Sequence, residues 1–363
     1  MAEIVKHLEP DLEELRESYR SGKTKEASWR KSQLKGLLTL LKEQEKDIFK
    51  ALEQDLGKHY AESYRDEVGT LSKSVNLALS SLKDWMSSRK AKLPIAAFPS
   101  TAEVFPEPLG LVLIISSWNL PFGLSLEPVI GAIAAGNAVV LKPSELAPAS
   151  SSLLAKTIPT YLDKKAVKVI EGGVAIGEHL LCCKWDKIFF TGNARVGRIV
   201  MTAAANYLTP VTLELGGKCP AIFDSFSSSW DKEMVIKRVL GGKFGTCAGQ
   251  ACIAIDYILV QEGFAPTLVL LLTIPNSSST FFFSFFVNSG FQTNRKSLFF
   301  LQTFQLELLR NMTKKMFGEN PRETQSMARI INKQHFLRLK NLLDDPSVQS
   351  SIVHGGGMDE DNL

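Results

Sequence analysis

The feature that most constrains the fold is an alternation of short apolar runs with stretches of helical spacing, from about residue 102 to residue 215. The apolar runs are residues 110–115, 138–141, 167–170, 187–190 and 211–215, and the stretches between them are 121–135, 145–157, 174–183 and 195–206. Continuous apolar strands that alternate with helices are typical of a parallel sheet covered on both faces. We therefore expect an α/β fold that binds its ligands at the carboxyl ends of the strands.

Residues 10–87 have helical periodicity instead. Apolar side chains recur on one face and charged side chains fill the opposite face; the apolar positions are Leu34, Leu37, Leu38, Leu41, Ile48 and Leu52. Such a pattern is typical of amphipathic helices that pack on a core. We expect these helices to contribute packing and no chemistry of their own.

The composition excludes several classes of function. The chain has 363 residues and a net charge of only +4, without a run of Lys and Arg or basic residues interleaved with aromatic ones, so no nucleic-acid partner is expected. Its five cysteines are an odd number without a CxxC pair, which favours a reducing compartment and no disulfide framework. Its five histidines are scattered, and no metal site is expected.

The chain also carries no evident targeting signal. The first residues are charged and lack the apolar region of a secretory signal. Residues 268–287 are apolar at both ends, but Pro275 and a run of Asn, Ser and Thr that follows it disfavour a spanning helix. We expect no membrane association and a cytoplasmic location.

Residues 269–303 differ from the rest of the chain. They are rich in Phe, Ser and Leu, without helical or strand periodicity, and an ordinary amphipathic pattern resumes after Leu306. Pyrimidine-rich codons encode such runs. Our hypothesis is that this segment is translated intron or an error in the gene model; the alternative is a disordered surface insertion.

Cys252 is the first candidate for chemistry. It ends the run Gly249-Gln-Ala-Cys252, which places a thiol after a flexible backbone that a substrate can approach closely. A cysteine thiolate is a strong nucleophile. The alternative is a small buried apolar side chain, which we expect for Cys182 and Cys183 and, as a structural residue, for Cys247. A cysteine hydrolase is disfavoured because no histidine lies in a motif.

Glu214 lies inside the end of one expected strand, and Asn119 follows another. Glu214 stands in Leu-Glu-Leu-Gly-Gly, where burial in an apolar strand end would raise its pKa towards that of a general base; the alternative is a carboxylate facing solvent. Asn119 could donate its amide to a developing oxyanion, or cap the helix expected to start near Pro121.

Two further motifs favour a nucleotide. Lys142 and Glu145 lie just past a strand end, where they suit a ribose or a phosphate. Gly192, Asn193 and Gly197 form a glycine turn between a strand and a helix, which suits a pyrophosphate at the helix N-terminus. The chain lacks GxGxxG, so the common dinucleotide fingerprint is absent.

Taken in this order, the five motifs resemble the aldehyde dehydrogenase superfamily, and most closely its class 3 family in the plant form. The resemblance covers residues from about 10 to 268 and resumes from about 305 to 363, with Phe317–Pro321, Arg329–Lys333 and Ile352–Gly356 similar to later segments of that family. It implies a Rossmann-type parallel sheet that binds the cofactor and an incomplete α/β catalytic domain.

The resemblance also implies the roles of individual residues. Cys252 would be the nucleophile, Glu214 the base that activates water, and Asn119 a donor to the oxyanion. Lys142 and Glu145 would contact the adenine ribose, and Gly192, Asn193 and Gly197 the pyrophosphate. Trp118 would lie on the cofactor side. The cofactor would be NAD or NADP, and the substrate a small aldehyde.

The sequence departs from the family pattern in two places. The family usually has Asn where this chain has Cys247 and Ala248. The family's Glu-x-Phe-Gly-Pro motif, its later Ser-Gly-Gly and Pro-Phe-Gly-Gly segments, and its C-terminal pairing strand have no counterpart up to Leu363. A homodimer is expected for the family, but its pairing segment is missing here. The alternative expectation is a catalytically impaired, truncated form that binds nucleotide or pairs with full-length subunits.

The expected domains follow from the same resemblance. Residues 1–213 would form the N-terminal helices and the NAD(P)-binding domain, with 85–106 as a bridging or oligomerisation segment. Residues 214–363 would form a partial catalytic domain that contains the aberrant insertion at 269–303.

Overall fold

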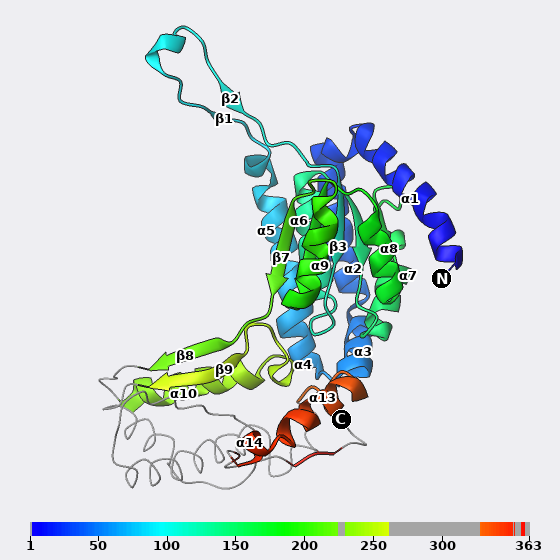
Figure 1. Ribbon diagram of the computed structural model, residues 1–363. Helices are drawn as coiled ribbons and strands as arrows, with labels where there is room; N and C mark the ends of the chain where they lie inside the picture. Colours follow the sequence, from blue (N-terminus) through cyan, green and yellow to red (C-terminus); the bar gives the residue numbers. More distant parts are fainter. Residues whose placement is uncertain (1, 224–228, 261–326, 351, 353–356, 360–363) are drawn as a thin grey trace. The chain divides into compact units, whose positions relative to one another are not determined.

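The computed structural model describes residues 2–223, 229–260, 327–350, 352 and 357–359 (Figure 1). It divides into two units. Unit 1 comprises residues 1–55 and 63–215, and unit 2 comprises residues 56–62 and 216–363. The hypothesis about residues 269–303 lies outside the described residues. No described helix is long and apolar enough to cross a membrane.

A parallel sheet of five strands forms the centre of unit 1. Its strands are β3 (Leu111–Ile115), β4 (Ala138–Lys142), β5 (Val167–Val169), β6 (Lys187–Gly192) and β7 (Val211–Leu215). They lie in the order β5-β4-β3-β6-β7. Counted along the chain, this is the order 3-2-1-4-5 of doubly wound sheets. The predicted α/β fold with a parallel sheet is confirmed.

Helices cover both faces of this sheet (Figure 1). Along the chain the helical elements of unit 1 are α1 (Ala2–Arg20), the 3-10 turn η1 (Lys23–Lys25), α2 (Ala27–Glu43), α3 (Glu45–Leu56), the π-helix η2 (Tyr64–Val68), α5 (Gly69–Trp85), α6 (Gly123–Ala135), α7 (Pro148–Tyr161), α8 (Val174–Cys182) and α9 (Ala194–Ala205). The short helix α4 (Tyr60–Ser63) belongs mostly to unit 2. One apolar core includes residues of α2, α3, α5, α6 and α7, and a second includes residues of α1, α8 and α9.

The alternation of side chains along a strand explains why there are two cores. Val112 and Ile114 of β3 belong to the first core, whereas Leu111 and Leu113 belong to the second. Successive side chains of a strand point to opposite faces, so a strand covered on both sides must be apolar at every position. This requirement is the reason that the central strands are continuous apolar runs in the sequence.

The N-terminal helices also supply a cap to α7. This helix has Ala147 at its N-cap position, which offers no capping side chain. The carboxylate of Asp55, at the end of α3, accepts the backbone N–H groups of Ala149 at 3.0 Å and Ser150 at 2.8 Å. A carboxylate at this end satisfies unpaired donors and interacts favourably with the helix dipole. The N-terminal helices thus contribute more than apolar packing.

Residues 85–106 form a hairpin that extends from unit 1 (Figure 1). Strand β1 (Arg89–Lys90) pairs antiparallel with β2 (Glu103–Val104), and the 3-10 turn η3 (Ile95–Ala97) lies between them. Ile95, Phe98 and Phe105 are exposed. The bridging or oligomerisation role of this segment stays a prediction.

Unit 2 contains a second, smaller parallel pair. Strand β8 (Cys219–Phe223) pairs with β9 (Ile255–Val260), with an irregularity in the pairing between Cys219 and Pro220. Helix α10 (Ser229–Phe244) connects the strands and is followed by the 3-10 turn η4 (Cys247–Gly249). Helices α13 (Lys333–Leu343) and α14 (Pro346–Gln349) come later in the chain.

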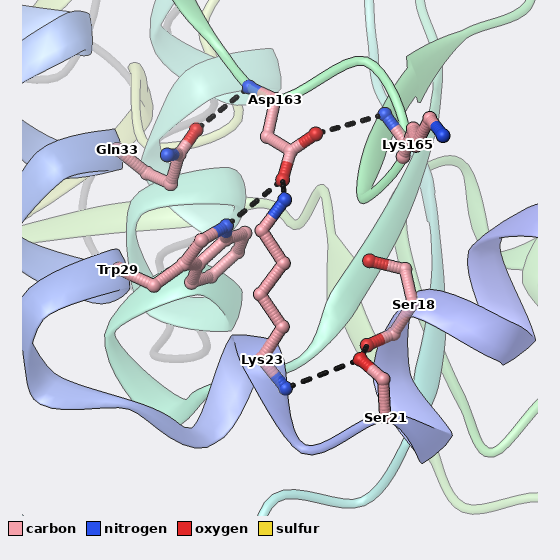
Figure 2. A network of polar contacts seen from close by, with 7 residues as sticks. All are labelled: Ser18, Ser21, Lys23, Trp29, Gln33, Asp163 and Lys165. Carbon is pink, nitrogen blue, oxygen red and sulfur yellow. Dashed lines mark hydrogen bonds and ion pairs between the residues drawn. The ribbon is translucent and has the colours of Figure 1, made fainter.

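A polar network joins the first helices to the turn that leads into β5 (Figure 2). The carboxylate of Asp163 lies 2.6 Å from the ammonium nitrogen of Lys23 and accepts a hydrogen bond from the indole N–H of Trp29 at 3.0 Å. The backbone N–H of Asp163 donates to Gln33, and its carboxylate accepts from the backbone of Lys165. Burial alone would raise the pKa of Asp163, but the hydrogen bonds from Lys23 and Trp29 outweigh it and lower that pKa.

We predict that Asp163→Asn lowers the free energy of unfolding by about 1–2 kcal/mol at neutral pH. Because the folded-state pKa lies below the unfolded one, the contribution of this carboxylate is complete above about pH 4 and is lost as the pH falls through the folded-state value. Urea denaturation followed by circular dichroism should therefore show that the difference in the free energy of unfolding between the wild type and Asp163→Asn decreases at acidic pH. Asp84 is exposed, so Asp84→Asn serves as the control. A loss of unfolding free energy in Asp163→Asn that does not change with pH would contradict the stabilising role of the Asp163 carboxylate.

Candidate active site

The predicted residues of unit 1 gather at one edge of its sheet. Asn119 follows β3, Lys142 ends β4, Asn193 follows β6, and Glu214 lies near the end of β7. Strand β3 pairs in parallel with both β4 and β6, so the carboxyl ends of these strands share an edge. This is the edge at which open α/β sheets bind ligands, and β3 and β6 flank the point where the strand order reverses.

Lys142 and Glu145 form a partly buried ion pair at this edge. The Lys142 ammonium lies 2.6 Å from the Glu145 carboxylate and also donates to the carbonyl of Pro143 at 3.1 Å. The side chain of Lys142 is 6% exposed and that of Glu145 is 38% exposed. An ammonium beside an accessible carboxylate offers both a donor and an acceptor to the hydroxyl groups of a sugar, so this pair suits a ribose.

The turn between β6 and α9 has the shape expected of an anion site. The side chain of Asn193 accepts the backbone N–H of Val196 at 3.0 Å and so caps α9. Gly197 is buried in the first turn of α9, where a Cβ atom would lie 3.2 Å from the side chain of Leu215. The missing side chain therefore lets α9 pack closely on β7, which is one of the roles of glycine in dinucleotide-binding turns. The residues present fit a pyrophosphate.

Asn119 does not cap the helix that follows it, so that alternative is wrong. Helix α6 begins at Gly123, and no side chain of its own caps it. Instead, the carboxylate of Glu67 accepts the backbone N–H groups of Phe122 at 2.8 Å and Gly123 at 3.1 Å. Asn119 is buried, at 6% exposure, in the loop that Glu67 holds. Its role as an oxyanion donor stays a prediction.

Glu67 was not among the residues predicted from the sequence, although its position on a helix carries a signal. Glu67 is fully buried in η2, four residues before the buried Leu71. Side chains four residues apart share one face of a helix, so this carboxylate lies on an apolar face. A buried carboxylate on such a face needs donors, and here the donors are backbone N–H groups of the next functional loop.

Glu214 and Trp118 differ in exposure. The side chain of Glu214 is exposed, so of the two alternatives the structure shows a carboxylate at an open strand end and not a buried one. Trp118 is half-buried beside Asn119. The roles proposed for both residues stay predictions.

In unit 2, Cys252 is exposed and follows an unusual turn. Cys247, Ala248 and Gly249 have φ values of +50°, +50° and +87°. A residue with a Cβ atom is strained in this left-handed region by about 1–2 kcal/mol, whereas Asn tolerates it better. The two positions where the family usually has Asn are therefore those that adopt the strained conformation.

The other cysteines are placed as follows. Cys247 is buried as predicted, but Cys182 is exposed, so its prediction as a core residue is wrong. Cys183 is half-buried, and burial raises the pKa of its thiol. No role was predicted for Cys219. Its sulfur lies 3.5 Å from the carbonyl oxygen of Cys252. None of the five, all of which are described, is in a disulfide.

The predicted site residues are absent from the pocket between α8 and α9. This pocket of about 390 Å³ in unit 1 is lined by residues of α8, including Glu178 and Cys182, by residues of α9 and by Tyr207, which follows α9. Within the described part of the chain, no group of three or more His, Cys, Asp or Glu side chains could hold a metal ion.

Comparison with known proteins decides the family. A model of the aldehyde dehydrogenase family matches residues 10–274. The chain belongs to the aldehyde dehydrogenase family. The chain is 46% identical over its whole length to aldehyde dehydrogenase family 3 member F1 of Arabidopsis thaliana and 37% identical over 97% of its length to family 3 member A2 of Macaca fascicularis. The resemblance to class 3 in its plant form is confirmed.

The solved structures agree with this family. The chain resembles the aldehyde dehydrogenase AldH of Staphylococcus aureus, in a substrate-bound state, with a TM-score of 0.80 and 36% identity over 98% of this chain and 68% of that chain. The NAD-dependent aldehyde dehydrogenase of Sinorhizobium meliloti is 26% identical, with a TM-score of 0.65 over 74% of this chain and 53% of that chain. The aldehyde dehydrogenase chain spans 67% of family 3 member F1 and 57% of family 3 member I1, chloroplastic, of Arabidopsis thaliana.

We predict that Ala248→Asn stabilises this aldehyde dehydrogenase by about 0.5–1 kcal/mol, because Asn adopts the left-handed conformation at lower cost than Ala. Chemical denaturation measures the change. The control is Ala251→Asn in the same loop. Ala251 does not have a positive φ, so this substitution should not raise the free energy of unfolding. Equal effects at both positions would show that strain at Ala248 is not the cause.

Proposed function

We propose that this protein oxidises a small aldehyde to a carboxylic acid, with NAD or NADP as the electron acceptor. The observation that carries the proposal is the exposed thiol of Cys252, presented after a strained turn in a chain of the aldehyde dehydrogenase family. An accessible thiol is required for attack on a carbonyl, and a held loop reduces the entropy lost in reaching the attack geometry.

The reaction would proceed by addition of the thiolate, loss of hydride and hydrolysis of the resulting thioester. The thiolate of Cys252 forms a C–S bond to the aldehyde carbon, and the carbonyl π electrons move to oxygen. The backbone N–H of Cys252 and the side-chain amide of Asn119 would donate to that oxyanion, and one such donor is typically worth about 3–4 kcal/mol. Loss of hydride from carbon leaves a thioester. Glu214 would take a proton from water, which adds to the thioester and expels the thiolate with the acid as product.

The nucleotide would bind along the carboxyl edge of the unit 1 sheet. Bound NAD(P)⁺ supplies the hydride acceptor. Lys142 and Glu145 offer a donor and an acceptor to the adenine ribose, and the N-terminus of α9 with Gly192 and Asn193 offers donors to the pyrophosphate. Trp118 would lie on the cofactor side.

We predict that Glu145→Gln shifts the cofactor preference towards NADP. The carboxylate of Glu145 can accept from a ribose 2′-hydroxyl, but it repels a 2′-phosphate. Its replacement by an uncharged amide should raise the ratio of NADP affinity to NAD affinity by about tenfold, which quenching of tryptophan fluorescence can measure for both nucleotides. The exposed Glu178→Gln on α8 is the control, and an unchanged ratio in Glu145→Gln would remove Glu145 from the ribose site.

Turnover is tested by the formation of reduced nicotinamide with hexanal and with benzaldehyde, in the presence of NAD and then NADP. We predict that Cys252→Ser lowers kcat by about a thousandfold or more, because the hydroxyl is a far weaker nucleophile. Cys182→Ser, which also removes an exposed thiol, should keep the wild-type rate. Undiminished turnover in Cys252→Ser would exclude the proposed mechanism.

A second candidate is nucleotide binding without turnover. The predicted nucleotide contacts all belong to unit 1, whereas the candidate nucleophile Cys252 belongs to unit 2, so nucleotide binding does not require the nucleophile. Nucleotide-dependent stabilisation of a protein without aldehyde oxidation would favour this candidate. Pairing with other subunits and a cytoplasmic location remain parts of the proposal.

A further inference from the structure

A ring of hydrogen bonds encloses the turn that precedes the candidate nucleophile in unit 2. The backbone N–H of Cys247 donates to the carboxylate of Glu62 at 2.7 Å. The side-chain amide of Gln250 donates to the carbonyls of Cys247 at 3.0 Å and Arg329 at 2.9 Å. The ring closes where the backbone N–H of Arg329 donates to the carbonyl of Leu56 at 2.6 Å, because Leu56 and Glu62 are joined by a short stretch of chain.

The contact between Glu62 and Cys247 is shielded from water. Glu62 is 8% exposed and Cys247 is 0% exposed. A buried acceptor without a donor is costly, and so is a buried N–H without an acceptor, so separating Glu62 from Cys247 would leave both groups unsatisfied. Glu62 therefore binds the backbone of Cys247 firmly to the segment of residues 56–62.

The chain is shaped to bring this segment close. Gly57 has a φ of +63°, and a Cβ atom there would lie only 2.7 Å from the Cγ atom of Arg329. Both the backbone conformation and the close approach require glycine. The segment that carries Glu62 is thus packed directly against the residue to which Gln250 is bound.

The turn would relax without this support. Cys247 and Ala248 are non-glycine residues in the left-handed region, which their side chains disfavour. If the N–H of Cys247 lost its acceptor, the turn could adopt other conformations, and the residues after it would move. A displacement of about 1 Å in a reacting group can lower a rate by two orders of magnitude.

We propose that Glu62 is a positioning residue, which holds the strained Cys247–Gly249 turn through the backbone of Cys247 and so places the thiol of Cys252 for attack. This rests on the proposed role of Cys252 as the nucleophile. Glu62 acts through the oxygen that accepts the N–H, and not through its charge.

This distinction predicts a ranking of variants. Glu62→Gln keeps an acceptor oxygen at the same reach, whereas Glu62→Asp keeps the charge but shortens the side chain by one carbon, and Glu62→Ala removes the acceptor. The rate constant for alkylation of Cys252 by iodoacetamide, measured on the Cys252 peptide by mass spectrometry and expressed per folded molecule, should fall about tenfold in Glu62→Ala and Glu62→Asp. It should stay within about threefold of wild type in Glu62→Gln.

Turnover provides the second readout. We expect kcat for aldehyde oxidation to fall in parallel with the alkylation rate, while the KM for the nucleotide stays the same. In the Glu62→Ala background, Ala248→Asn should restore part of the lost alkylation rate, because it favours the same turn by another route. Glu53→Ala, which removes an exposed carboxylate from α3, is the matched control and should change neither rate.

The outcomes separate this proposal from the proposed function. If Glu62→Asp reacts faster than Glu62→Gln, or if all three variants alkylate at the wild-type rate once folded, the proposal is overturned. If Glu62→Ala does not fold, the ranking of the Asp and Gln variants decides. A wild-type protein without turnover, whose Cys252 alkylation still follows the ranking, would overturn the proposed function and leave the positioning role supported.

Discussion

The burial of the unit 1 sheet on both faces is the constraint on which the rest of this structure depends. Because α2, α5, α6 and α7 cover one face and α1, α8 and α9 cover the other, every strand position in the centre must be apolar, and polar groups are confined to the strand ends. All five strands run in the same direction, so their carboxyl ends meet at one edge. The polar residues predicted as site residues in unit 1 gather there for that reason.

Buried carboxylates bind the backbone of two loops that carry predicted site residues. Within unit 1, Glu67 accepts the backbone N–H groups of Phe122 and Gly123, which follow Asn119. Within unit 2, Glu62 accepts the N–H of Cys247, which precedes Cys252. Loop backbone lacks the regular partners of helices and strands, and its donors need acceptors once water is excluded. These two acceptors lie five residues apart in the chain, in helical segments whose sequence suggested packing alone.

The turn before Cys252 shows how stability and reactivity can be opposed. Ala248 costs the protein stability in a left-handed conformation that Asn would adopt more readily. The conformation persists because hydrogen bonds from Glu62 and Gln250 over-determine it. A strained turn that is firmly held can present a thiol in one orientation, which a relaxed and mobile turn of the same length cannot do.

The sequence by itself determined the strands, the helices between them and the motifs at the strand ends, because local periodicity and the need to bury both faces leave a direct trace in the order of residues. It also indicated the family through Cys252, Glu214 and Asn119. Only the tertiary structure decided that Glu67 caps α6 in place of Asn119, that Glu214 is exposed, and that Glu62 and Gln250 form hydrogen bonds with the backbone of Cys247. These contacts join residues that are distant in the chain, up to 185 positions apart for Glu62 and Cys247, and no local pattern records which donor a buried acceptor will meet.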